Sequence, residues 1–284
     1  MTTSVTKLQQ NYNQQGFLSA LPVLNDAELR EARQAFSELE KEFGEDYTQY
    51  SLHNVHLQYP WVMGLSKHPR ILEVVKAVLG PDVILLDSRF ICKYPTLKAA
   101  NIQEREESKL PYVAWHQDMR YWGIAGGPVL SVWLALDDSL EENGALQVIP
   151  GSHCSGMLLH RPAVRPGNML SVNQEIPEEL VQVEDAVLCP LAAGQMSIHD
   201  GLLVHASDAN TSERRRCGFV IRYVPTCASP TQVRQTQSIT HELCIEHLLL
   251  LLFCSQDPDR PRKFHATVLV SGTDQFNHFS NKRT

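Results

Sequence analysis

The pattern of apolar positions divides the chain into a first part that reads as helical and a second part rich in short strands. Asn25 and Glu28 have the spacing of a helix capping box. The apolar residues that follow recur at spacings of three and four, which places them on one helix face: Leu29, Ala32, Phe36, Leu39 and Phe43. A second stripe begins at Pro69 and stops at Gly80. The first eighty residues are therefore predicted to be helical.

From residue 83 the pattern changes to short β-rich runs separated by Gly, Pro, Asn or Asp. The run at 129–136 is nearly all apolar, which is typical of a central strand. Short strands with turn signals between them favour a sandwich or barrel over alternating strand and helix units. The predicted strands are 83–94, 112–116, 129–136, 145–149, 167–172, 195–199, 202–205 and 219–224.

Composition and charge exclude several classes of protein. The 284 residues are 43% hydrophobic and 20% charged, an ordinary globular balance. With a net charge of −7 and no long basic run, the chain is not expected to bind nucleic acid or an anionic membrane surface. The longest apolar run, 248–254, is far shorter than the roughly twenty residues of a membrane span.

Cysteine usage and the first residues indicate a cytoplasmic protein. The 7 cysteines are an odd number and form no C-x-x-C pair. The opening residues, MTTSVTKLQQ, lack the apolar segment of a secretory signal. Reduced thiols are therefore expected rather than a disulfide framework.

The triplet His116-Gln117-Asp118 is the sharpest candidate for chemistry. If the triplet continues a strand, residues i and i+2 share a face, so the imidazole and the carboxylate would lie side by side while Gln117 points away. One more histidine would complete the 2-His-1-carboxylate triad of non-haem Fe(II) oxygenases. By itself such a triplet is weak evidence, because it also occurs as a hydrogen-bonded pair at a surface or in a core.

Two histidines further along the chain could supply the third ligand. His199 and His205 share strand parity only if the strand is unbroken, and Asp200-Gly201 is expected to break it. The apolar run 202–204 would bury the ring of His205. Of the three arginines at 214–216, two are predicted to be solvated, while a buried one could hold a carboxylate through its guanidinium fork.

Taken in order, these motifs resemble those of the phytanoyl-CoA dioxygenase (PhyH-like) family of Fe(II)/2-oxoglutarate oxygenases, over about residues 10–224. The resemblance implies a mainly β fold with flanking helices, a double-stranded β-helix (jelly roll, cupin-like). We expect a single domain, 1–284, with a helical N-terminal layer (1–82), a jelly-roll core (83–225) and a C-terminal extension (226–284). The matching motifs are Tyr12-Asn-Gln-Gln-Gly-Phe17, Trp115-His-Gln-Asp118, Val132-Trp133-Leu-Ala-Leu, Glu142-Asn-Gly-Ala-Leu-Gln-Val-Ile-Pro-Gly-Ser-His153 and His205-Ala-Ser-Asp-Ala-Asn-Thr-Ser-Glu-Arg-Arg-Arg216.

The same resemblance implies the roles of individual residues. The iron ligands would be His116, Asp118 and His205. Arg216 would pair with the distal carboxylate of 2-oxoglutarate, with the hydroxyl of Ser207 beside it. The remaining assignments are Lys93 and Trp133 to the wall of the co-substrate pocket, His153 to a structural turn, and His199 to a position behind the ligands or in the core.

The implied activity is that of a dioxygenase that uses Fe(II), 2-oxoglutarate and O2 and releases succinate and CO2. It would hydroxylate or otherwise oxidise a small organic or amphiphilic molecule, beside the mouth residues Trp115, Arg120, Tyr121 and Trp122. Because Asp118 is retained, hydroxylation is favoured over halogenation. Two alternatives stay open, an inactive jelly-roll binding protein and a cupin-type metalloenzyme that does not use 2-oxoglutarate. The segment 238–263 departs from the family pattern, and the sequence indicates no oligomeric state.

Overall fold

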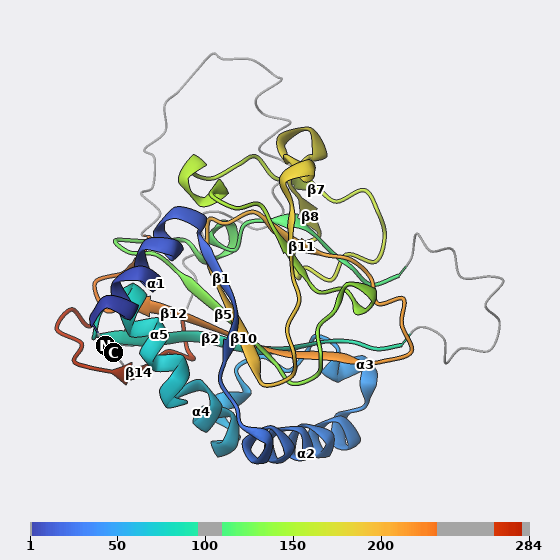
Figure 1. The fold of residues 1–284 in the computed structure, drawn as a ribbon, viewed down its shortest axis with the longest axis horizontal. Helices are drawn as coiled ribbons and strands as arrows, with labels where there is room; N and C mark the ends of the chain where they lie inside the picture. The colour runs from blue at the N-terminus through green and yellow to red at the C-terminus, as the bar shows by residue number, and fades with distance from the viewer. Residues whose placement is uncertain (1, 96–109, 232–263, 280–284) are drawn as a thin grey trace, which may run out of the picture.

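Two antiparallel sheets form a jelly roll in the computed structural model, which describes residues 2–95, 110–231 and 264–279 (Figure 1). The order of the larger sheet is β1 (Phe17–Pro22), β10 (Gln195–Asp200), β5 (Leu130–Ala135), β12 (Arg216–Pro225), β2 (Val83–Lys93) and β14 (Val268–Ser271). The order of the smaller sheet is β3 (Val113–His116), β11 (His205–Ser207), β6 (Leu146–Val148) and β9 (Val187–Cys189). The predicted double-stranded β-helix is confirmed.

Short elements connect and flank these sheets. Two further pairs of strands are β4 (Ile124–Ala125) with β13 (Ser229–Pro230), and β7 (Arg161–Pro162) with β8 (Gln174–Glu175). The 3-10 turns are η1 (Val55–Leu57), η4 (Glu141–Asn143), η5 (Ser152–Ser155), η6 (Glu178–Leu180) and η7 (Val183–Asp185). The helices are α1 (Thr2–Gln15), α2 (Asp26–Phe43), α3 (Glu45–Thr48), α4 (Pro60–Ser66), α5 (Pro69–Leu79) and α6 (Met119–Trp122).

Helices α2, α4 and α5 cover the outer face of the larger sheet. The predicted capping box starts α2, because the Asn25 side chain accepts from the backbone N–H of Glu28 and the Glu28 carboxylate accepts from that of Asn25. The helix stripes pack on apolar side chains of the sheet, with Phe36 against Phe90 and Phe90 against Phe219. Among the described residues, no helix is both long and apolar enough to cross a bilayer.

Strand alternation leaves the inner face of the larger sheet partly polar. In β12 the apolar Phe219 and Ile221 belong to the core under the helices, whereas Val220 and Arg222 line a cavity on the other face. In β5 the same alternation sends Trp133 to the cavity. One face of the larger sheet thus packs into the hydrophobic core, and the other face presents polar and charged side chains to the cavity.

Several predicted elements differ from the structure. The first eighty residues also contain β1, which pairs with β10 after the positive-φ turn at Gly16 ends α1. Residues 167–172 form turns and bends with a single β-bridge, from Asn168 to Tyr112. The run 202–205 is a turn followed by β11, which begins at His205. Strand β14 comes from the predicted C-terminal extension. The predicted loop at 97–110, apart from Leu110, and the segment 238–263 lie outside the described residues.

Candidate metal centre

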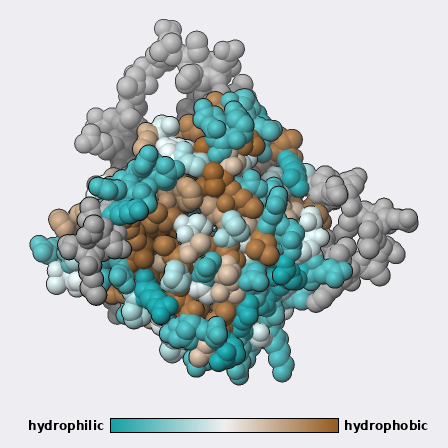
Figure 2. All heavy atoms as spheres, in the orientation of Figure 1, coloured by the Kyte–Doolittle hydropathy of each residue, from teal (hydrophilic) through white to brown (hydrophobic). Residues whose placement is uncertain are grey.

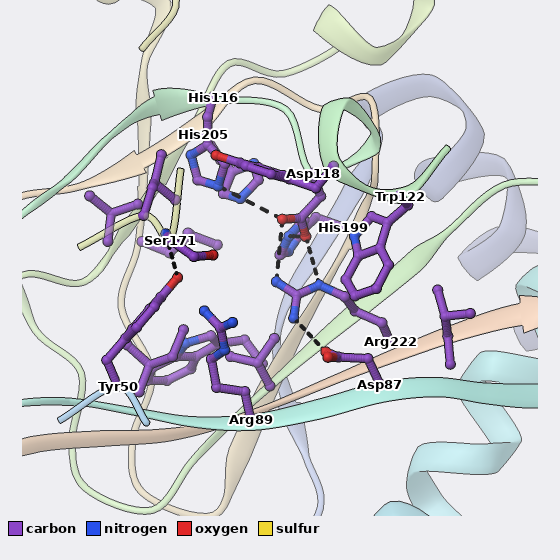
Figure 3. Close-up of a pocket in the computed structure, with 18 of the residues that line it drawn as sticks. Tyr50, Asp87, Arg89, His116, Asp118, Trp122, Ser171, His199, His205 and Arg222 are labelled. Carbon is purple, nitrogen blue, oxygen red and sulfur yellow. Dashed lines mark hydrogen bonds and ion pairs between the residues drawn. The ribbon is translucent and has the colours of Figure 1, made fainter. Parts of the chain in front are cut away.

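Two neighbouring strands and the turn after one of them bring His116, Asp118 and His205 together. His116 ends β3 and His205 begins β11, and the two are direct register partners. Asp118 is not on the strand, as the two-residue spacing had predicted, but in the turn that opens α6. One potential ligand atom of each residue lies within 4.8 Å of the other two (Figure 3). All three side chains are buried.

Both imidazoles are held in the form that a metal requires. Nδ1 of His116 donates to the carbonyl of Ala114 at 2.8 Å, and Nδ1 of His205 donates to the carbonyl of Leu203 at 2.9 Å. These bonds place the lone pair on Nε2, which in His116 faces Asp118 Oδ1 at 3.8 Å. Burial lowers the pKa of His116, and burial followed by the neighbouring imidazoles lowers that of His205 further. The two rings are therefore neutral near pH 7.

Asp118 is held ionised by groups from three strands of the larger sheet. Ser131 Oγ donates to Oδ2 at 2.6 Å, and Arg222 donates to both carboxylate oxygens, at 3.2 and 3.3 Å. His199 Nε2 lies 3.7 Å from Oδ2. Burial acts to raise the pKa of Asp118, but the Arg222 charge above all, with the histidines, holds it well below its usual range. His199, Ser131 and Arg222 occupy one transverse row across β10, β5 and β12.

The side chain of Gln117 points away from the cluster and fixes the turn that carries it. Gln117 Nε2 donates to the carbonyls of Gly156 and Leu202, at 2.8 and 2.7 Å, and Oε1 accepts from the backbone N–H of Leu158. The residue is fully buried. Three bonds to two loops, 156–158 and the turn at Leu202, therefore set the direction of the chain between His116 and Asp118.

A cavity of about 370 Å³ opens beside the cluster, between the two sheets. Its wall is mostly apolar and aromatic around a few charged groups, a composition typical of small-molecule sites. Figure 3 shows His116, His205 and Asp118 on one side of it, and Tyr50 and Arg89 on the opposite side. The apolar and aromatic residues of the wall include Leu86, Ile91, Tyr121, Trp122, Trp133, Leu170, Val220 and Phe264.

A buried arginine, Arg216, also lines the cavity and forms no ion pair with a carboxylate of the described residues. Arg216 is 2% exposed, and its Nε has no hydrogen-bond partner among the described residues. Its guanidinium lies 5.0 Å from the ring centroid of Trp133. Burial lowers the pKa of Arg216 to about 10, so it stays protonated near pH 7. A buried cation without a counter-ion is a site for an anionic ligand.

Lys93 and Ser207 lie beside this arginine. Lys93 is the register partner of Arg216 on β2, and its Nζ donates to Ser207 Oγ at 2.6 Å. Burial, followed by the charge of Arg216, lowers the pKa of Lys93 well below its usual range. Ser207, Arg216 and Trp133 line the cavity, whereas Lys93 reaches it through Ser207. The predicted co-substrate residues thus come together from β2, β5, β11 and β12.

Other predicted positions fall away from the cavity. Trp115 packs against Ile149 and Val204, and the exposed Arg120 is absent from the cavity wall. His153 Nε2 bonds to the carbonyl of Asn13. Arg215, predicted to be solvated, instead pairs with Asp137 and Glu40.

The sequence reading missed Asp87, Arg89, Tyr50 and Arg222. A charged residue inside an otherwise apolar strand could have indicated three of them. Arg222 interrupts the apolar run 219–224, and Asp87 and Arg89 interrupt the run 83–94. A residue of that kind must face a partner or a ligand when its strand is central. Tyr50 carried no such signal.

The donor set suits divalent iron. Two neutral imidazoles and one carboxylate on one side of a cavity are the ligands of non-haem Fe(II) oxygenases, which keep further metal positions open. Each histidine also has its second nitrogen fixed by a carbonyl, and the carboxylate is itself hydrogen-bonded, as metal-binding residues require. The residues present therefore fit the metal.

Comparison with known proteins gives a family match over most of the chain. The profile of the phytanoyl-CoA dioxygenase (PhyH) family matches residues 12–218. The L-proline trans-4-hydroxylase of Streptomyces griseoviridis is 25% identical over 237 residues, covering 75% of this chain and 83% of that protein. A probable alpha-ketoglutarate-dependent hypophosphite dioxygenase of Stutzerimonas stutzeri is 25% identical over 177 residues, 62% of this chain, and the match spans only 57% of that relative.

A solved structure shows the same architecture. The non-heme monooxygenase ThoJ, in its apo form, superimposes with a TM-score of 0.63 at 28% sequence identity. The superposition covers 79% of each chain.

Proposed function

Because the chain belongs to the phytanoyl-CoA dioxygenase (PhyH) family, we propose that it is an Fe(II)- and 2-oxoglutarate-dependent dioxygenase that oxidises a small organic or amphiphilic molecule. One observation carries the proposal: the His116–Asp118–His205 cluster opens onto the same cavity as the buried Arg216, which pairs with no carboxylate of the described residues. Bound Fe(II) would supply dioxygen activation, coupled to conversion of 2-oxoglutarate to succinate and CO2.

The protein residues have distinct roles in this proposal. His116 and His205 offer Nε2 to the metal, and Asp118 offers a carboxylate oxygen. Arg216 binds the distal carboxylate of 2-oxoglutarate and supplies the charge that no described carboxylate neutralises. Ser207, whose hydroxyl accepts from Lys93, is placed to donate to the same carboxylate.

Hydroxylation is the favoured outcome. Asp118 occupies the third ligand position and is held there by Ser131 and Arg222, so a halide would have no vacated ligand position to take. The cavity, with its aromatic walls, suits a substrate of small-molecule size. The name of the Streptomyces relative, a proline hydroxylase, supports the same reaction class.

Succinate release tests this proposal. Purified protein with Fe(II), 2-oxoglutarate and O2 should release succinate, at least in slow turnover without the primary substrate. His116→Ala and Asp118→Ala should abolish it, because each removes a metal ligand. His153→Ala is the matched control, since this histidine bonds to α1 and should keep the activity.

The same assay separates the two alternatives. An inactive binding protein would take up 2-oxoglutarate without forming succinate. A metalloenzyme that does not use 2-oxoglutarate would neither bind it nor form succinate. Either result would replace the proposed function.

A further inference from the structure

We propose that Arg89 binds a carboxylate of the primary substrate, so that the oxidised molecule is a small organic monoanion with an apolar body. The inference rests on the proposed function and adds the chemical class of its substrate. It starts from the inner face of β2, where alternate residues Asp87, Arg89 and Ile91 line the cavity. The register partner of Arg89 is Val220 on β12, one row along from Arg222.

Arg89 lies across the cavity from the candidate metal ligands. His116 and His205 belong to the smaller sheet, while Arg89 belongs to the larger sheet (Figure 3). The space between them is part of the same cavity of about 370 Å³. A molecule held at Arg89 would therefore direct its carbon skeleton toward the metal side.

Charge pairing leaves Arg89 as the available cation. Three arginines and two aspartates line the cavity among the described residues. Both aspartates, Asp87 and Asp118, bind Arg222, at 3.1 and 3.2 Å. Arg216 is assigned to the co-substrate. No carboxylate in the described part of the chain forms an ion pair with Arg89, although the charge of Asp87 acts on it from two residues along β2. With a divalent metal bound beside Asp118, Arg222 would balance Asp87, and the charge of Arg89 would be left for a ligand.

Neutral groups hold the Arg89 guanidinium in place. It lies 4.0 Å from the ring centroid of Tyr50, and its Nε and Nη2 donate to His53 Nδ1 at 3.2 and 2.8 Å. To accept these bonds His53 must be neutral, and burial, followed by the charge of Arg89, lowers its pKa to about 4. The two hydrogen bonds to His53 use Nε and Nη2 and leave Nη1 unengaged by that ring. The cation is thus oriented while part of its donor fork stays free.

The surroundings favour a carboxylate over a more highly charged group. Arg89 is half-buried, and burial lowers its pKa, so a counter-ion in the cavity would stabilise its charged form. One guanidinium balances one negative charge, whereas a phosphate would bring nearly two. Leu86, Trp122 and Phe264 supply apolar and aromatic surface for the rest of the molecule.

The test measures binding of benzoate and its neutral isostere benzamide by isothermal titration calorimetry. The protein is loaded anaerobically with Fe(II) and 2-oxoglutarate, so that Arg216 is occupied. Benzoate should bind at least about tenfold more tightly than benzamide, because a charge-assisted pair is lost with the amide. Arg89→Met should remove this preference, and Arg89→Lys should keep part of it.

Two controls give each outcome a meaning. Arg161→Met removes an exposed arginine that pairs with Glu175, and it should leave benzoate binding unchanged. Equal affinity for benzoate and benzamide, tighter binding of phenyl phosphate, no binding of benzoate, or an unaltered preference in a folded Arg89→Met variant would each overturn the inference. Failure of 2-oxoglutarate to bind the wild-type protein would instead overturn the proposed function.

Discussion

Gln117 shows how one buried side chain can define a metal centre without touching it. Its amide satisfies two carbonyls and one backbone N–H in loops far along the chain. These bonds hold the turn in which His116 and Asp118 diverge from the line of β3. A flat strand would have kept both on one face, and the observed turn instead lets Asp118 meet the inner face of the larger sheet.

Gln117→Met should therefore weaken metal binding while conserving side-chain volume. The variant leaves three buried polar groups unpaired, so the turn should lose its fixed direction. We expect a loss of about 10- to 100-fold in Fe(II) or Zn(II) affinity, the usual range for groups that orient ligands. Competition with a chromophoric chelator measures this affinity, and wild-type affinity in the variant would show that the turn is fixed by other contacts.

Arg222 pairs with two carboxylates, and this makes it a stabilising residue of the metal-free protein. Arg222→Met should lower the free energy of unfolding by about 3–5 kcal/mol, because Asp87 and Asp118 would be left buried and unpaired. Urea unfolding of the metal-free protein measures the loss.

Zn(II) should stabilise the Arg222→Met variant more than the wild type, since the metal can replace the missing cation beside Asp118. The matched change Arg161→Met, at an exposed pair, should cost less than about 1 kcal/mol. A loss this small for Arg222→Met as well would contradict the assigned charge pairing.

At the scale of elements, β12 and β5 shape the co-substrate end of the cavity through one glycine. A Cβ at Gly218 would collide with the indole ring of Trp133, on which the Arg216 guanidinium rests. Because Gly218 has no side chain, the indole ring of Trp133 can pack directly against the backbone of β12.

Gly218→Ala should displace Trp133 and weaken 2-oxoglutarate binding by about tenfold, at a stability cost of about 1–3 kcal/mol from overpacking. Calorimetric titration of 2-oxoglutarate into the metal-loaded protein measures the first effect. Gly64→Ala in α4 is the control, because its Cβ would meet nothing within 4 Å. Equal 2-oxoglutarate affinity in both variants would show that the position of Trp133 does not matter for this ligand.

Elements with strong local signals were predictable from the sequence, and those that depend on distant partners were not. The capping box of α2, the Pro69 start of α5 and the apolar β5 are all encoded in neighbouring residues. Strand β1 depends on pairing with β10 far along the chain, so its short run gave no local signal. The run at 202–205 was predicted as a strand because a buried turn can contain the same apolar residues as a buried strand.

At the scale of the whole molecule, histidines that are neutral in the folded state couple stability to pH. Partial withdrawal from water is the main cause that lowers the pKa of His53 and of His160 to about 4, from an ordinary value of 6.5 in each case. The unfolded chain then binds more protons between these values, so the free energy of unfolding should fall as pH drops from about 6.5 to about 4.

Urea unfolding at several pH values in this range measures the slope. His160→Gln should reduce the slope of unfolding free energy against pH, because the folded state then no longer excludes a proton at that position. The control Arg161→Met, at an exposed arginine, should leave the slope unchanged. A stability that is flat over this interval would contradict the neutral state of both rings in the folded protein.

The candidate site was predictable where it lies in contiguous motifs, and not where sheet register assembles it. His116, Asp118, His205 and Arg216 stand in short motifs that the sequence displays directly. Arg222 reaches the centre only because β12 pairs with β2 and β5 in one register. The position of a side chain across a sheet depends on that pairing, which no single segment encodes.

The most direct test of the central claim is an anaerobic titration of Fe(II) and 2-oxoglutarate into the metal-free protein, followed by visible absorption. We predict a metal-to-ligand charge-transfer band only when both are present. The band should be absent in Asp118→Ala, weakened in Arg216→Ala and retained in His153→Ala. A folded wild-type protein that gives no band, or a band that Arg216→Ala leaves unchanged, would contradict the assignment of the His116–Asp118–His205 centre and its co-substrate arginine.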